Sequence, residues 1–79
     1  MPTIQKISDA YRFFFYSFDC NEPEHVHVKR ERKMCKFWLD PIELSKNDGF
    51  SSKELNQIRG IIVKRLDVIL EAWDEHCGE

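Results

Sequence analysis

The clearest pattern in the chain is an apolar helical stripe in its second half. Its members recur every three or four residues: Leu55, Ile58, Ile62, Leu66, Ile69 and Trp73, flanked by Val63 and Leu70. At 100° per residue these positions share one side of a helix. Ser51-Ser52-Lys53-Glu54 has the sequence of a capping box, so we predict a long helix over residues 51–77.

The first half of the chain predicts strands. Four segments are rich in β-branched or aromatic residues, at 3–7, 10–18, 25–30 and 33–39. Turn-favouring Ser8-Asp9 separates the first two, and Glu31-Arg32 stands at the bend between the last two. We therefore predict two hairpins in one antiparallel sheet.

The second hairpin has a definite predicted register. A two-residue bend at Glu31-Arg32 pairs positions whose numbers sum to 63. The expected pairs are Val26 with Phe37 and Val28 with Cys35 on the core face, and His25 with Trp38 and His27 with Lys36 on the other face.

Between sheet and long helix, Asp40-Pro41-Ile42-Glu43 combines a side-chain acceptor, a proline and a following glutamate, as helix starts do. It predicts a short helix over residues 41–45. The whole chain, residues 1–79, is then one α+β domain: a four-stranded antiparallel sheet of two hairpins (3–39), a short helix, and one long C-terminal helix packed on one sheet face.

Composition narrows the class of protein. Seventy-nine residues form one small domain with a modest core, for which a partner or a second copy adds stability. Twelve basic against fourteen acidic residues give a net charge of −2, so no global positive field favours nucleic acid. We expect nucleic acid only as a less favoured partner, with self-association as an alternative.

The cysteines and the apolar runs suggest a location. Cys20, Cys35 and Cys77 are odd in number and lack Cys-x-x-Cys spacing, which argues against a disulfide framework and a zinc ribbon. No stretch reaches the roughly 18 apolar residues of a membrane span. We expect a cytoplasmic protein with reduced cysteines and no membrane contact.

Two apolar surfaces exceed what one helix can cover. Residues 11–18 are aromatic on both faces of the predicted strand, and a single helix covers one face. The expected partner-binding residues are Phe14, Tyr16 and Trp38 on the uncovered face, with Ile61 and Val68 on the outer side of the long helix. The alternative is that the short helix or the loop before His25 covers the aromatic face, and that Ile61 and Val68 are isolated apolar surface residues.

The candidate chemistry lies on the predicted strand 25–30. His25 and His27 point the same way, and with Lys36 they are candidates for acid–base catalysis. Zinc needs further ligands, and the sequence offers only Asp19, Cys20 and His76-Cys77 nearby. We therefore predict no metal and no cofactor. The structural alternative is that both histidines stack on Trp38 and its aromatic neighbours.

A basic segment, 29–33, marks the hairpin tip. The residues expected to contact phosphates or an acidic partner are Arg12, Arg30, Arg32 and Lys33. The alternative is a solvated, charge-protected hairpin. The common nucleotide-binding and hydrolase motifs are absent, so the sequence leaves open whether the protein is an enzyme.

Several segments together resemble a bacterial family of unknown function, numbered 4160. They are Met1-Pro2-Thr3-Ile4, Arg12-Phe13-Phe14-Phe15, Pro23-Glu24-His25-Val26-His27-Val28, Lys36-Phe37-Trp38-Leu39-Asp40-Pro41, Gly49-Phe50-Ser51 and Leu70-Glu71-Ala72-Trp73. The segment Pro23 to Val28 is the most specific, although the family usually has a second proline where this chain has Glu24. At the hairpin tip the family often has glycine, whereas this chain has Glu31-Arg32.

The resemblance implies a function. Members are small bacterial or phage proteins, often encoded beside a second small uncharacterised protein, and such pairs look like type II toxin–antitoxin modules. By that resemblance this chain is the toxin, neutralised by direct binding of a small cognate antitoxin. The alternatives are a non-catalytic protein-interaction module and, less favoured because of the acidic balance, an RNA-cleaving toxin that uses His25 or His27.

Overall fold

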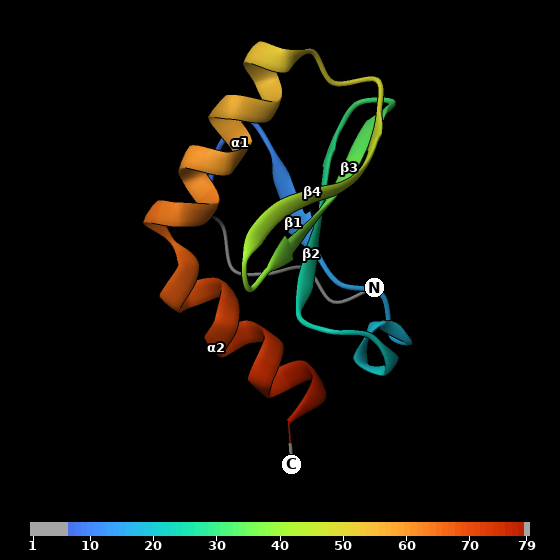
Figure 1. Cartoon of the computed structure of the whole chain (residues 1–79), viewed down its shortest axis with the longest axis vertical. Coiled ribbons are helices and arrows are strands. Elements are labelled where there is room, and N and C mark those ends of the chain that lie inside the picture. The colour runs from blue at the N-terminus through green and yellow to red at the C-terminus, as the bar shows by residue number, and fades with distance from the viewer. Residues whose placement is uncertain (1–6, 79) are drawn as a thin grey trace.

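A four-stranded antiparallel sheet with helices on one side forms the fold. The computed structural model describes residues 7–78 (Figure 1). Its elements are β1 (Arg12–Phe14), the 3-10 turn η1 (Asp19–Asn21), β2 (His25–Arg30), β3 (Lys33–Leu39), β4 (Ile42–Asp48), α1 (Ser52–Lys64) and α2 (Leu66–Cys77). The sheet has the order β1-β2-β3-β4. The predicted α+β class, with a four-stranded antiparallel sheet followed by helices, is confirmed.

The β2–β3 hairpin has the predicted register. Val28 lies opposite Cys35 and His27 lies opposite Lys36, so the sum-of-63 pairing is confirmed. The bend forms although it lacks glycine, because Glu31 adopts a left-handed backbone conformation with φ of 57°. The hydrophobic alternation of the two strands therefore sets the register despite an unfavourable turn sequence.

The strands are not all where the sequence placed them. The predicted strand 10–18 is shorter, because only Arg12–Phe14 pairs with β2. The predicted strand 3–7 lies outside the described residues except for Ile7, which is not in a strand. The sheet nevertheless has four strands, since β4 takes the fourth place beside β3.

The predicted short helix over residues 41–45 is wrong. Asp40 and Pro41 form the two-residue connection between β3 and β4, with a cis peptide bond between them. An Asp-Pro pair suits a β-turn as well as a helix start. The edge of β3 offers residues 42–48 a ladder of backbone hydrogen bonds, and this tertiary pairing decides between the two.

The predicted helix start is confirmed, but the single long helix is not. The Ser51 hydroxyl accepts a hydrogen bond from the Glu54 amide at 3.2 Å, and the Glu54 carboxylate accepts one from the Ser51 amide at 3.1 Å. At Arg65, with φ of −114° and ψ of 24°, the helix bends and divides into α1 and α2. Val63, expected beside the core, is 59% exposed because it lies on the outside of this bend.

The core lies between the helices and one sheet face. The buried residues include Phe13, Val26, Val28 and Phe37 from the sheet and Ile58, Ile62, Ile69 and Trp73 from the helices. Figure 1 shows α1 and α2 following each other along the same side of the sheet. Because the helix bends at Arg65, both α1 and α2 bury apolar side chains against the twisted sheet. One straight helix would diverge from the sheet along its length.

A disulfide between Cys20 and Cys77 joins η1 to the end of α2, across 57 residues of sequence, with 5.4 Å between the two Cα atoms. The expectation of three reduced cysteines is therefore wrong for this pair. Sequence spacing could not reveal it, because only the fold brings the two residues together. Cys35 is free and buried, and burial raises the pKa of its thiol to about 12.

Among the described residues, no helix combines the length and hydropathy that a membrane span requires.

Candidate functional site

The sheet face opposite the helices, here called the outer face, carries the candidate residues. Its end near β1 and β2 is covered by the loop that contains η1, as the alternative interpretation of the sequence held. Phe14 is 1% exposed and His25 is fully buried. Phe14, expected to bind a partner, and His25, a candidate for catalysis, are therefore inaccessible. The rings of Tyr16 and His27 lie against Phe14, while Asp19 of η1 and Trp73 of α2 cover His25.

Asp19 is the residue that organises this end of the outer face. Its Oδ1 lies 3.2 Å from His25 Nε2, and its Oδ2 lies 3.1 Å from His27 Nε2. The Tyr16 amide donates a hydrogen bond to Oδ2 at 2.7 Å. We call Asp19, His25 and His27 the histidine cluster. It joins one carboxylate from η1 to two imidazoles from β2.

Aromatic rings enclose the cluster. His25 lies 5.6 Å from the ring of Trp38 and 5.2 Å from that of Trp73 in α2. His27 stacks on Phe14 at 5.5 Å and meets the edge of Tyr16 at 4.7 Å. The alternative interpretation, in which both histidines stack on Trp38 and its neighbours, therefore holds only in part: His27 stacks on Phe14, whereas His25 meets Trp38 and Trp73 edge-on. These ring contacts hold both imidazoles in place.

The pKa values in the cluster follow from burial and charge. Burial lowers the pKa of His27, and the nearby Asp19 carboxylate only partly opposes this. Burial alone would raise the pKa of Asp19, but the Tyr16 amide and the two imidazoles outweigh it, so its pKa is lowered. A charged carboxylate therefore faces a neutral His27 near pH 7.

His27 also lines an open pocket on the outer face, which we call the outer-face pocket. It encloses about 250 Å³ between Tyr16, His27, Met34, Cys35, Lys36, Lys46 and Asp48. Lys36 and Lys46 lie directly opposite each other on β3 and β4, next to a register shift in that pairing. Like charges opposite each other are unfavourable in a sheet, and an anion between them would relieve the repulsion.

Lys36 is held at the rim of this pocket. Its ammonium lies 4.4 Å from the centre of the Trp38 ring and bonds to the Glu22 carboxylate at 2.5 Å. Glu22 is half exposed, and this bond lowers its pKa. Lys36 is thus oriented by a solvated partner, whereas Lys46 is exposed. The structure brings together three predicted residues, His27, Lys36 and Tyr16, at one pocket.

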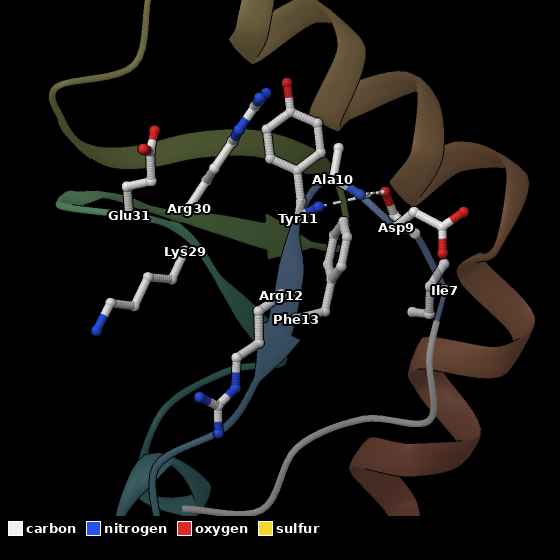
Figure 2. A pocket seen from close by; sticks show the side chains of 10 residues that line it. Ile7, Asp9, Ala10, Tyr11, Arg12, Phe13, Lys29, Arg30 and Glu31 are labelled. Atoms are coloured by element: carbon white, nitrogen blue, oxygen red, sulfur yellow. Dashed lines mark hydrogen bonds between the residues drawn. The ribbon is translucent and has the colours of Figure 1, made fainter.

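The predicted basic contacts do not form one patch. Arg12 and Arg30 line a second pocket of about 360 Å³ beside β1 (Figure 2). Figure 2 shows Arg30 lying along Tyr11, with 5.7 Å between guanidinium and ring, while Arg12 points away from it. Arg32 is exposed at the hairpin tip, and Lys33 bonds to Glu54 at 2.6 Å. Arg12 and Arg30 therefore share one pocket, whereas Arg32 and Lys33 lie in other surroundings.

The apolar residues expected on the outer side of the helix are half-buried. Ile61 packs partly against the core, and Val68 lies just beyond the bend in α2. Phe18 is more exposed than either of these residues, at 68%, and its ring stacks on that of Tyr16 at 5.5 Å. Exposed apolar surface thus occurs beside the outer-face pocket, at a residue that was not selected from the sequence.

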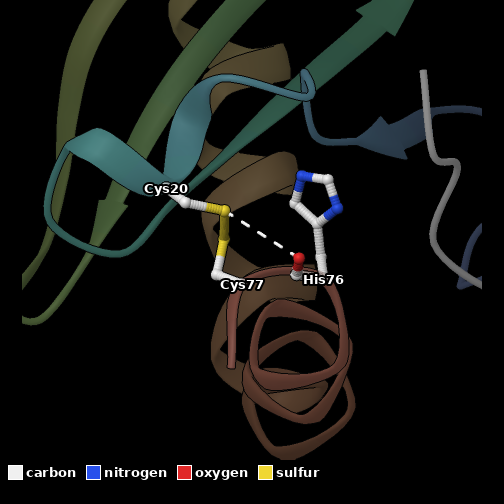
Figure 3. Close-up of side chains that lie close together, drawn as sticks. All are labelled: Cys20, His76 and Cys77. Carbon is white, nitrogen blue, oxygen red and sulfur yellow. Dashed lines mark hydrogen bonds between the residues drawn. A yellow bond between two sulfur atoms is a disulfide. The ribbon is translucent and has the colours of Figure 1, made fainter. Parts of the chain in front are cut away.

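Within residues 7–78, two groups of side chains converge closely enough to hold a metal ion: the histidine cluster, and Cys20 with His76 and Cys77. In the second group the sulfur atoms are bonded to each other, and Figure 3 shows the His76 ring beside this disulfide. His76 Nε2 instead lies 2.9 Å from the Tyr16 carbonyl oxygen. The second group therefore serves to fasten the η1 loop to α2.

Sequence reasoning underestimated two residues of the site. Asp19 was considered only as one possible zinc ligand, because nothing in a loop of turn-formers says which side chain folds inward. Lys46 directly follows the predicted helix over residues 41–45, so its pairing with Lys36 could not be foreseen. A strand prediction for residues 42–48 would have placed these two lysines side by side.

The comparisons with known proteins agree with the resemblance noted in the sequence. Searches of curated proteins and of solved structures find no match. A family model described as a domain of unknown function, DUF4160, matches residues 10–74, which include the sheet, α1 and most of α2. The chain therefore belongs to the DUF4160 family.

Proposed function

We propose that this chain is the toxin of a bacterial or phage type II toxin–antitoxin module, and that it acts through the outer-face pocket. One observation carries the choice of this surface: His27, backed by the Asp19 carboxylate, lies beside two opposed lysines, Lys36 and Lys46. Membership in the DUF4160 family supports the module, by the resemblance described above.

The pocket is suited to an anionic target. Lys36 and Lys46 both line the pocket, and their positive charges favour a bound phosphate or carboxylate, which would compete with Glu22 for the Lys36 ammonium. A neutral imidazole at the same place can accept a proton from a group bound there. His27 fits this role better than His25, since His25 is fully buried between two tryptophans.

The same proposal includes an antitoxin and a cytoplasmic location. Tyr16 and Phe18 form an exposed aromatic edge next to the pocket, which a bound antitoxin would cover while blocking access to His27. Cytoplasmic thiols are kept reduced, and cytosolic disulfides are usually transient or regulatory. In that compartment the Cys20–Cys77 bond would therefore form reversibly.

Induced expression in a bacterial host tests the proposal. We expect the wild-type chain to arrest growth, His27→Ala and Lys36→Ala to relieve the arrest at least tenfold in colony count, and the neighbouring gene product to restore growth. Lys64→Ala, which removes an exposed lysine from α1, is the matched control and should arrest growth as the wild type does.

Two outcomes would overturn parts of this proposal. Normal growth on expression of the folded wild-type chain removes the toxin function. Undiminished arrest by folded His27→Ala and Lys36→Ala variants, verified by circular dichroism, removes the outer-face pocket as the acting surface.

A further inference from the structure

We infer that the histidine cluster is a zinc site, with His25 Nε2, His27 Nε2 and a carboxylate oxygen of Asp19 as ligands. The three ligand atoms lie within 4.8 Å of one another. Tetrahedral zinc with bonds of about 2.0–2.1 Å separates its ligands by roughly 3.3 Å. Asp19 Oδ1 lies 3.2 Å from His25 Nε2 and Asp19 Oδ2 lies 3.1 Å from His27 Nε2, so each imidazole nitrogen has one carboxylate oxygen at about this spacing.

Both imidazole nitrogens that face Asp19 lack a hydrogen bond. His25 Nε2 and His27 Nε2 are buried and have no hydrogen-bond partner among residues 7–78, although an Asp19 oxygen lies close to each. A buried polar atom without a partner costs about 1–3 kcal/mol. Since two such atoms aim at one carboxylate, a cation between them would satisfy all three side chains at once.

The orientation of His25 supports a metal more directly. His25 Nδ1 lies 2.8 Å from the Pro23 carbonyl oxygen, which can only accept, so Nδ1 is the ring nitrogen that donates there. Nε2, on the other side of the ring, faces Asp19 Oδ1 at 3.2 Å. Metal-bound histidines characteristically donate their second ring N–H to a carbonyl or carboxylate in this way.

The remaining surroundings hold the ligands in position. The Tyr16 amide orients the Asp19 carboxylate, and the disulfide at Cys20, the next residue, fastens η1 to α2. Trp38 and Trp73 enclose the His25 ring. Ligands fixed by such packing lose little freedom when an ion binds, which favours affinity.

The donor set and its exposure indicate which metal and which geometry. Two imidazoles and one carboxylate suit zinc, whereas magnesium and calcium prefer oxygen ligands alone. Three protein ligands leave a fourth position for water, as in catalytic zinc sites. His27 lines the outer-face pocket, so the site adjoins it. In the zinc-bound protein the metal-held water, rather than the Nε2 lone pair of His27, would accept a proton from a group bound in the pocket. This inference replaces the sequence-based prediction that the protein binds no metal, and it does not depend on the toxin proposal.

Zinc titration of the chelator-treated, disulfide-bonded protein tests the inference. Calorimetry should give one zinc per chain with a dissociation constant of micromolar or below, and cobalt should give the visible spectrum of a four-coordinate N/O site. His27→Gln and Asp19→Asn should each weaken zinc binding at least tenfold. His76→Gln, which alters the other group of potential ligands, is the matched control and should bind as the wild type does.

The inference is overturned by absence of one-to-one zinc binding to the wild type, by unchanged affinity in folded His27→Gln, or by loss of affinity confined to His76→Gln. His27 is partly exposed, so its variant decides the matter even where Asp19→Asn fails to fold. Because zinc binding is measured in the purified protein, its failure is separate from any failure of the growth experiment.

Discussion

The Cys20→Ser, Cys77→Ser double variant should melt at least 10 °C below the oxidised wild type. The disulfide closes a loop across 57 residues, and a cross-link of that span restricts the unfolded chain by about 4 kcal/mol in the chain-entropy model. In a domain of this size each kcal/mol corresponds to about 4–8 °C in melting temperature. Thermal unfolding followed by circular dichroism measures the change.

Reducing agent provides the matched control for this prediction. It should lower the melting temperature of the wild type to that of the double variant and leave the double variant unchanged. Unreduced, denatured wild type should show a single reactive thiol, that of Cys35. A wild-type melting temperature that is insensitive to reductant, despite complete reduction, would contradict the role given to this bond.

Asp19→Ala should reduce the free energy of unfolding by about 2 kcal/mol in the presence of chelator. The substitution leaves the Tyr16 amide without the carboxylate oxygen that accepts from it, and a buried polar group left without a partner costs about 1–3 kcal/mol. Urea denaturation measures this loss.

Asp19→Asn is the matched comparison, because it keeps an oxygen that can accept from the Tyr16 amide while removing the charge. We expect it to lose about half as much stability, since the backbone hydrogen bond remains. Loss of less than about 0.5 kcal/mol in Asp19→Ala, below the usual effect of a buried polar truncation, would show that the carboxylate does not organise this end of the sheet.

The sequence predicts well those parts of the fold whose signals are local. The capping box at Ser51 and Glu54 and the alternation of β2 and β3 depend on neighbouring residues, so the helix start and the register could be foreseen. The strand over residues 42–48 could not be foreseen, because its sequence fits a helix start as well as a strand. The pairing with the edge of β3 decides between the two.

The candidate site shows the same division. The placement of His25 and His27 on one face followed from strand periodicity, and Lys36 followed from the register. The inward turn of Asp19 and the Cys20–Cys77 bond depend on how an irregular loop packs against a helix 57 residues away. No periodic pattern carries that information, so the loop was expected to be solvated while it in fact closes over the histidines.

The central claim is that the Asp19 carboxylate lies against His27, which lines the outer-face pocket. An NMR titration of the His27 ring in metal-free wild type and in Asp19→Asn tests it most directly. Burial holds the pKa of His27 below its ordinary value of 6.5, and Asp19 raises it in part, so Asp19→Asn should lower the pKa of His27 further. A wild-type pKa of 6.5 or above that is unchanged in Asp19→Asn would contradict the account.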